Sequence, residues 1–224
     1  MDDDSAFWDR LLSHASEMQE WFQNGIVFIG GIAIASYAAV QKKVTLVVPF
    51  SHDVDFMISV ADYGDLRDIE AIIPNQRLSK SQFTRDGFEF DVYVEGTHDL
   101  PVPYDEAFTE SLLINNLRVA SIPHLLVLKL KAYQDRRASS KGQKDQDDIF
   151  RCLLYATEFE ITPESAVRLD SSDIVLLNHV VKSDAAYRLA GGNLHPAAIL
   201  RDIASDGLDI LKRLTPHVAR PSPK

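Results

Sequence analysis

The sequence lacks the features that would indicate a membrane anchor, a disulfide framework or a zinc site. A single cysteine, Cys152, stands among 224 residues, so no intramolecular disulfide can form. The apolar runs are interrupted well before the roughly 18 residues of a membrane span. The seven histidines show no HxxxH or His/Cys spacing typical of zinc sites. The first residues, MDDDSAFWDR, are acidic where a secretory signal would be basic. We therefore expect a cytoplasmic protein with no membrane partner.

Positive charge is also scarce. The net charge of −10 argues against broad, non-specific binding to nucleic acid. A local groove for tRNA stays open as an interpretation, because basic residues gather in two places. A solvated charged face is the alternative for each of them. The two groups are Arg77, Lys80 and Arg85, and Arg136, Arg137, Lys141 and Lys144.

The first half of the chain has the pattern of a mixed α/β domain. Helical spacing over 5–22 is followed by short apolar or alternating segments typical of strands. Asp86-Gly87 predicts a tight β-hairpin turn, and Asn115-Asn116 predicts a second one. The predicted strands are 26–29, the DVDF segment at 53–56, 81–85, 88–96, 112–114 and 117–120, with further helices after Gly31 and over 62–73.

The second half has a helical pattern throughout. The polar segment SSKGQ, 139–143, predicts a break between its first two helices. Within DIFRCLLYA, Cys152 is predicted to be a small core residue of a helix. The sequence thus predicts an α+β protein, with an α/β domain over 1–120 and a helical domain over 121–224. The predicted helices are 122–137, 144–156, 172–190 and 196–214.

A Gly-Gly turn lies between a predicted strand and a predicted helix. Gly30 and Gly31 follow IVFI and precede IAIASYAAV. Glycine lets the backbone approach a ligand closely, and a helix N-terminus presents free N–H groups to an anion. A phosphate cradle and a closely packed turn both explain this pattern. The segment matches neither GxGxxG nor GxxxxGK[ST], which argues against a dinucleotide-binding fold and a P-loop NTPase.

Three acidic residues lie on predicted strands. In SHDVDF, alternation places Asp53 and Asp55 on one face of a strand and Val54 on the other. Neighbouring carboxylates repel one another unless a cation or basic side chains compensate. Asp91, on the polar face of FEFDVYV, adds a third acid of the kind that a metal-dependent phosphoryl-transfer site needs.

In their order, the segments GGIAIASYA, SHDVDF, FEFDVYV, SIPHLLVLKLKAYQDRR and KDQDDIF resemble the nucleotidyltransferase superfamily of the DNA polymerase β type. They are most similar to the minimal bacterial branch that includes the toxins of AbiE-type abortive-infection systems. The resemblance covers roughly residues 24 to 155. It implies a nucleotidyltransferase-like mixed β-sheet with flanking helices, and a possible antitoxin partner.

The resemblance also implies roles for individual residues. Gly30 and Gly31 match the phosphate-binding turn, and Ser51 is expected near the phosphates. The catalytic acids Asp53, Asp55 and Asp91 match the ligands of Mg²⁺ or Mn²⁺. On the predicted helices, Lys129 matches the lysine that reaches the triphosphate, with Lys131 as the second choice. Asp145 and Asp148 match later acids of the nucleotide site, while a salt-bridged, solvated helix start is their alternative.

These roles predict transfer of a nucleoside monophosphate from an NTP to a hydroxyl group of a tRNA, a protein or a small molecule. The chain departs from the branch at Pro49, where members often carry a basic residue. A catalytically inactive relative that acts as a binding or regulatory module is therefore the alternative hypothesis.

Overall fold

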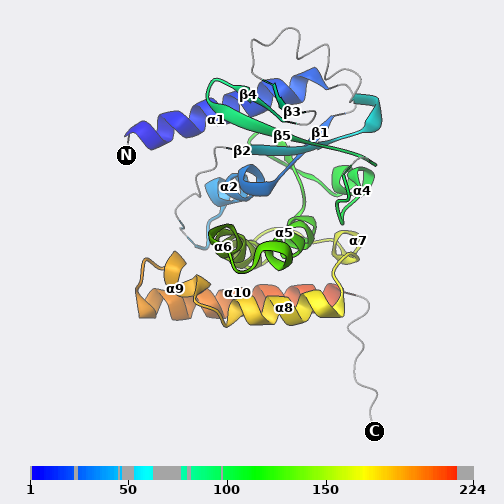
Figure 1. The fold of residues 1–224 in the computed structure, drawn as a ribbon. Helices are drawn as coiled ribbons and strands as arrows, with labels where there is room; N and C mark the ends of the chain where they lie inside the picture. Colours follow the sequence, from blue (N-terminus) through cyan, green and yellow to red (C-terminus); the bar gives the residue numbers. More distant parts are fainter. Residues whose placement is uncertain are drawn as a thin grey trace. The chain divides into compact units, whose positions relative to one another are not determined.

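The computed structural model describes residues 2–22, 25–44, 46, 53–62, 77–79, 82–96 and 98–215. It confirms the predicted α+β class with a helical C-terminal half (Figure 1). Two compact units divide the chain: Met1–Ala39 with Val48–Ala120, and Val40–Val47 with Ser121–Lys224. The predicted helix 62–73, apart from its first residue, lies outside the described residues, and so does Ser51.

The first unit is built around a mixed sheet, which has seven strands among the described residues in the order β3-β4-β5-β2-β1-β7-β6. Strand β2 is parallel to β5, and β1 is parallel to β7, while the other neighbours are antiparallel. Its elements are α1 (Asp2–Trp21), β1 (Ile26–Ile29), α2 (Gly30–Val40), β2 (Asp53–Ile58), β3 (Arg77–Ser79), β4 (Gln82–Arg85), β5 (Phe88–Val94), α4 (Tyr104–Thr109), β6 (Leu112–Ile114) and β7 (Leu117–Val119).

Both predicted hairpin turns are confirmed. Asp86 and Gly87 have φ values of 51° and 87°, and Asn115 and Asn116 have φ values of 49° and 65°. Two consecutive positive φ values are the signature of the turn that matches the twist of paired strands, and Asn, Asp and Gly reach them at the lowest cost. Short-range chemistry therefore positions β4 against β5 and β6 against β7.

The two faces of the sheet differ in chemistry. Buried apolar residues alternate along β2 and β5, and Phe56, Phe88 and Phe90 belong to this apolar face. Helix α1 and the residue that follows it, Phe22, cover this face. The ring centroids of Phe7 and Phe88 are 4.9 Å apart, and those of Phe22 and Phe56 are 5.9 Å apart. The side chains at the intervening positions therefore project from the face opposite α1.

The second unit is all-helical within the described residues. Figure 1 shows α5 and α6 as one layer of this unit and α8 and α10 as another. The backbone N–H groups of Lys42 and Lys43 each donate to the Glu158 carboxylate at 2.7 Å, which attaches the segment after α2 to this unit. The helices are α5 (Ile122–Arg136), α6 (Ser140–Tyr155), α7 (Pro163–Ala166), α8 (Ser171–Val181), α9 (Ala185–Leu189) and α10 (Leu194–Leu214).

Two predicted helix boundaries were wrong. Helix α6 begins inside SSKGQ, because Ser139 caps it by accepting the Gly142 N–H at 3.1 Å. The predicted helix 172–190 is split into α8 and α9. There the Ser183 hydroxyl donates to the Val180 carbonyl at 2.7 Å and accepts the Ala185 N–H at 3.2 Å. A serine that bonds to nearby backbone in this way competes with helix continuation.

Candidate functional site

The acids predicted from the sequence lie on two neighbouring parallel strands. In the register of β2 and β5, Asp55 is paired with Asp91, and Asp53 is paired with Glu89. All four residues alternate with buried apolar residues. Because paired residues of adjacent strands project from the same face, the four carboxylates form one acidic row opposite α1. Such a row needs cationic compensation.

The Gly-Gly turn lies directly against this row. Gly30 is the first residue of α2 and has φ +63°, a conformation that favours glycine. A Cβ atom on Gly30 would lie 2.7 Å from Cγ of Asp55, so only glycine leaves room for this carboxylate. The positive end of the α2 dipole also stabilises a negative charge at this place. Gly31, the next residue, is buried in the first turn of the helix.

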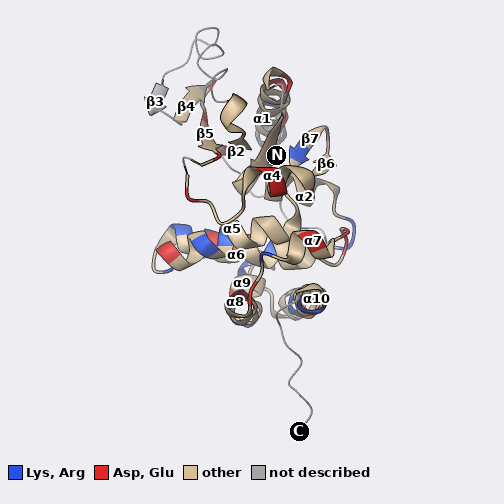
Figure 2. Ribbon diagram, turned by 90° about the vertical axis from the view of Figure 1, so that its right-hand side faces the viewer, with Lys and Arg blue, Asp and Glu red and all other residues tan. Residues whose placement is uncertain are grey.

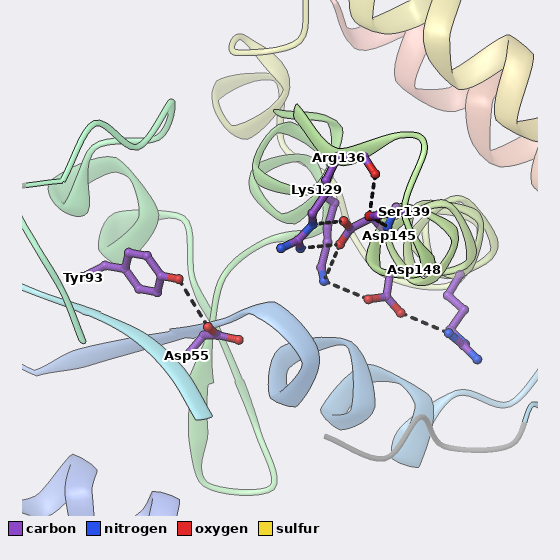
Figure 3. Close-up of polar contacts among 9 residues, drawn as sticks. Asp55, Tyr93, Lys129, Arg136, Ser139, Asp145 and Asp148 are labelled. Carbon is purple, nitrogen blue, oxygen red and sulfur yellow. Dashed lines mark hydrogen bonds and ion pairs between the residues drawn. The ribbon is translucent and has the colours of Figure 1, made fainter. Parts of the chain in front are cut away.

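Tyr93 joins the site, although sequence reasoning gave it no role. Its hydroxyl forms a long hydrogen bond of 3.5 Å to Asp55 Oδ1, as Figure 3 shows. Tyr93 stands two residues after Asp91 on β5, and period-two alternation places both on the acidic face. That spacing is the signal that would have indicated Tyr93 from the sequence.

Asp91 has an unsatisfied oxygen. Its Oδ1 atom is buried and has no hydrogen-bond partner among the described residues. Buried polar atoms are otherwise nearly always paired, so this oxygen has unused capacity to accept a proton or bind a cation. Carboxylate oxygens are also the ligand type that Mg²⁺ prefers. Within the part of the chain that the structure describes, no group of three or more His, Cys, Asp or Glu side chains lies close enough together to hold a metal ion.

In the second unit, the predicted Lys129, Asp145 and Asp148 are brought together. The Lys129 Nζ atom lies 2.8 Å from Asp148 Oδ2 and 3.4 Å from Asp145 Oδ1 (Figure 3). Both acids are almost fully buried, with side chains 1% exposed, and Lys129 is 12% exposed. These contacts agree with the salt bridges of the alternative interpretation of the two acids, but its solvated surroundings were wrong, because both acids are buried. The match of Asp145 and Asp148 to acids of a nucleotide site stays a prediction.

Two arginines complete this ion-pair network, which consists of Lys129, Arg136, Arg151, Asp145 and Asp148. Arg136 donates to Asp145 through Nε at 2.6 Å and through Nη2 at 3.0 Å. Arg151 Nη1 donates to Asp148 Oδ1 at 3.0 Å. The three cations exceed the two anions, and each acid accepts from at least two donors, which is the condition for a charged group to be tolerated in the interior.

The other basic residues near this network have different surroundings. Lys131, the second choice for the triphosphate lysine, is 57% exposed and pairs with Asp135 at 3.6 Å. Figure 2 shows basic and acidic segments side by side where α5 ends and α6 begins. Arg136 belongs to the basic group for which a tRNA groove and a solvated face were both left open, and it is bound to Asp145. This surface therefore carries both signs of charge.

Cys152 lies in the core of α6, as predicted. Its side chain is fully buried, and burial, followed by the nearby Asp148 carboxylate, raises the pKa of the thiol to about 12. Burial also raises the pKa of Tyr155 in the same helix. Neither group is a nucleophile at neutral pH, since the reactive form of cysteine is the thiolate.

None of the helices in the described ranges combines the length and apolar character that crossing a bilayer requires. No protein-family model matches the sequence, and no curated protein matches it either. Two solved structures are similar to this chain. The antibiotic-resistance factor ANT(2'')-Ia superposes with a TM-score of 0.47 at 15% identity, over 80% of this chain and 97% of that one. JHP933 from Helicobacter pylori superposes with a TM-score of 0.40 at 16% identity, over 84% and 85% of the two chains. With TM-scores below 0.5, neither likeness carries an argument about function.

Proposed function

We propose that this protein is a metal-dependent nucleotidyltransferase that moves a nucleoside monophosphate from an NTP to a hydroxyl acceptor. The observation that carries the proposal is the register of β2 and β5, which pairs Asp55 with Asp91. The Gly30 turn lies against the same carboxylate. Elements far apart in the sequence thus bring together the motifs whose order resembles the polymerase β-type superfamily.

The acids on β2 and β5 fit a divalent cation in ligand type. As they stand, these side chains are not grouped closely enough to hold an ion, so Asp53, Asp55 and Asp91 would have to turn toward Mg²⁺ or Mn²⁺ to bind it, with the buried Oδ1 of Asp91 as an oxygen in need of a partner. When bound, such an ion supplies charge neutralisation for the phosphates and for the departing pyrophosphate.

The start of α2 fits the phosphates. The first turn of a helix has backbone N–H groups without intrahelical partners, and they attract anions. Gly30 has no side chain and a left-handed backbone, so the chain can turn closely around a bound group. The N–H groups of Gly30 and Gly31 would therefore position the phosphates beside Asp55.

Where Asp91 does not bind the ion, it fits the role of general base instead. The acceptor oxygen would form a bond to the α-phosphorus of the NTP, the bond from this phosphorus to the bridging oxygen would break, and pyrophosphate would leave with the electron pair. The proton of the acceptor hydroxyl would move to Asp91, whose Oδ1 atom has no competing donor among the described residues. Proton transfer of this kind contributes about 10²–10⁴-fold in rate.

The acceptor class is part of the same proposal. A tRNA end, a protein hydroxyl and a hydroxyl-bearing small molecule all provide the required nucleophile. The resemblance to AbiE-type toxins further suggests that the activity is toxic and that an antitoxin binds the protein. Growth arrest on expression, relieved by Asp53→Asn with Asp55→Asn, would support the toxic role.

The test is transfer of label from each α-³²P-labelled NTP to the components of a cell lysate, with Mg²⁺ present and then removed by EDTA. We expect the wild type to label one class of acceptor and to stop in EDTA. The variant with Asp53→Asn and Asp55→Asn should lose at least about 10²-fold in rate. Its near-isosteric amides should preserve the fold, which circular dichroism checks.

Asp99→Asn is the matched control. It removes one carboxylate from an exposed position of the same unit, outside the acidic row. The control should transfer label at the wild-type rate. Transfer by the double variant at that same rate would overturn the proposal, and a wild type inactive with all four NTPs would favour the non-catalytic alternative.

A further inference from the structure

A small cavity opens at the end of the acidic row in the first unit. It has a volume of about 230 Å³. Strands β2 and β5 are parallel, so their C-terminal ends meet at one edge of the sheet, and the cavity lies there. The residues that line it are Met57, Tyr93, Val94, Glu95, Gly96, His98, Leu100, Val102, Pro103 and Tyr104.

The cavity is connected to the acids by one side chain. Tyr93 is a wall of the cavity, and its hydroxyl contacts Asp55 Oδ1 at 3.5 Å. The register pairs Tyr93 with Met57, two residues beyond the pair of Asp55 with Asp91. Two residues of a strand span about 7 Å. A ligand bound in the cavity would therefore place a second functional group, about that distance along the strand, beside Asp91.

The rings in the lining have defined orientations. The His98 ring is edge-on to Tyr93, with centroids 5.4 Å apart, and its Nδ1 atom accepts the Val94 N–H at 3.1 Å. Tyr104 donates its hydroxyl to the Gly25 carbonyl at 2.9 Å. These contacts hold three aromatic rings in place around a cavity whose remaining lining is mostly apolar, which suits a ligand ring rather than a phosphate.

The charge around the cavity is negative. Its described lining contains Glu95 but no Lys or Arg. The pKa of Tyr104 is raised to about 12, chiefly by burial and then by the carboxylates of Asp62, Asp105 and Glu95, against the opposing Arg118. An anionic ligand is repelled from such a site, while an ammonium group gains from the carboxylates and from the faces of the rings.

We infer that this cavity binds an amine-bearing ring of the hydroxyl acceptor, with the ring against Tyr93 and the ammonium group at Glu95. The hydroxyl to be modified lies toward Asp91. The volume is smaller than the roughly 300–1,000 Å³ of pockets for drug-sized ligands, so it takes one ring of the acceptor. This inference rests on the proposed function for the reaction, but the binding step requires neither NTP nor metal.

The test uses two probes of matched size, trans-4-aminocyclohexanol and trans-1,4-cyclohexanediol, added to the ¹⁵N-labelled protein without NTP or Mg²⁺. We expect the amine to shift the amide signals of Val94, Glu95 and Leu100 in a saturable manner. The diol should bind at least about threefold more weakly, as expected for the loss of a partly exposed cation–π and charge contact.

Two variants test whether the amine binds because of the cavity or only because the protein is acidic. Glu95→Gln should weaken the amine at least about threefold and leave the diol unchanged. Asp99→Asn removes the same charge from the same loop at an exposed position outside the lining, and should change neither probe. Three results would each overturn the inference. The two probes could bind equally well, Glu95→Gln could leave amine binding unaffected, or added adenosine could shift these amide signals while the amine does not.

The outcomes also distinguish this inference from the proposed function. If the wild type transfers label but does not bind the amine, only the inference about the acceptor is wrong. Conversely, the protein could bind the amine while Asp53 and Asp55 can be replaced without loss of label transfer. The proposed roles of these two acids would then be wrong, and the cavity would still be a binding site.

Discussion

The Asp55 carboxylate lies in the space that a side chain on Gly30 would fill. A Cβ atom at Gly30 would stand 2.7 Å from Asp55 Cγ, and the φ of +63° is unfavourable for most residues with a side chain. The first residue of α2 and the middle of β2 thus depend on each other sterically. This relationship joins the predicted phosphate turn to the predicted metal ligand within one unit.

Gly30→Ala should destabilise the protein more than Gly87→Ala does. Both glycines have positive φ, but a Cβ atom on Gly87 meets nothing within 4 Å. Gly87→Ala should therefore lower the free energy of unfolding by about 1–2 kcal/mol, from backbone conformation alone. Gly30→Ala should lower it by at least about 1 kcal/mol more, because its methyl group overlaps Asp55. Urea unfolding measures both values.

Combining Gly30→Ala with Asp55→Ala isolates the contact. Removing the carboxylate takes away Oδ2 and Cγ, the two atoms closest to the new methyl group, and leaves only the Cβ of residue 55 at 2.9 Å. The double variant should therefore lose less stability than the sum of the two single changes. Additive losses would show that the two residues do not compete for the same space.

Lys129→Met should lower the free energy of unfolding by about 1.5–3 kcal/mol, because the two buried acids each lose one charged donor and keep only an arginine. Asp148, 1% exposed, would lose its contact at 2.8 Å. Lys131→Met, at an exposed position of the same helix, should change the free energy by less than about 0.5 kcal/mol. Equal urea midpoints for the two variants would contradict the importance assigned to the network.

The cap of α8 predicts a specific pH dependence. Asp170 accepts the N–H groups of Ser172 and Asp173 at 2.7 and 2.9 Å. Its pKa is lowered, chiefly by the Ser172 hydroxyl and then by the Asp173 N–H. A lowered folded-state pKa contributes stability that is present above the unfolded value, about 3.9, and is lost as the pH falls through the folded value.

Asp170→Ala should therefore be about 1 kcal/mol less stable than the wild type at pH 7, and the gap should narrow below about pH 4. Asp170→Asn keeps a good cap that does not titrate. Its stability relative to the wild type should consequently rise as the pH falls through the same range. Asp173, whose pKa is raised by burial, is present in all three proteins and largely cancels. A gap that does not vary with pH would exclude the cap as its source.

Cys152 should be almost inert in the native protein. With its pKa raised to about 12, only about one thiol in 10⁴ is ionised at pH 8, against roughly a quarter in an unfolded chain with a pKa of about 8.5. Iodoacetamide should therefore label the native protein at least about 10³-fold more slowly than the protein in guanidinium chloride. Rapid native labelling would show that α6 opens readily. No second cysteine complicates the measurement.

Local features of this protein could be predicted from the sequence because neighbouring residues determine them. Asp86-Gly87 and Asn115-Asn116 form their turns through their own tolerance of positive φ. Period-two alternation placed Asp53 and Asp55 together on one face, opposite the buried Val54. The same local reasoning failed at the start of α6 and at the break before α9, where a single serine side chain bonded to nearby backbone decides the boundary.

Only the tertiary structure decided which of these residues meet. The parallel register that pairs Asp55 with Asp91, and the contact of Asp148 with Lys129, join positions 36 and 19 residues apart. The cavity beside Tyr93 likewise needs strand ends and loops together. Spacing along the chain does not encode such pairings, because they follow from burying the apolar face of the sheet and the inner faces of the helices. The sequence by itself determined the acids and glycines that chemistry requires, and the packing inside each unit determined their partners.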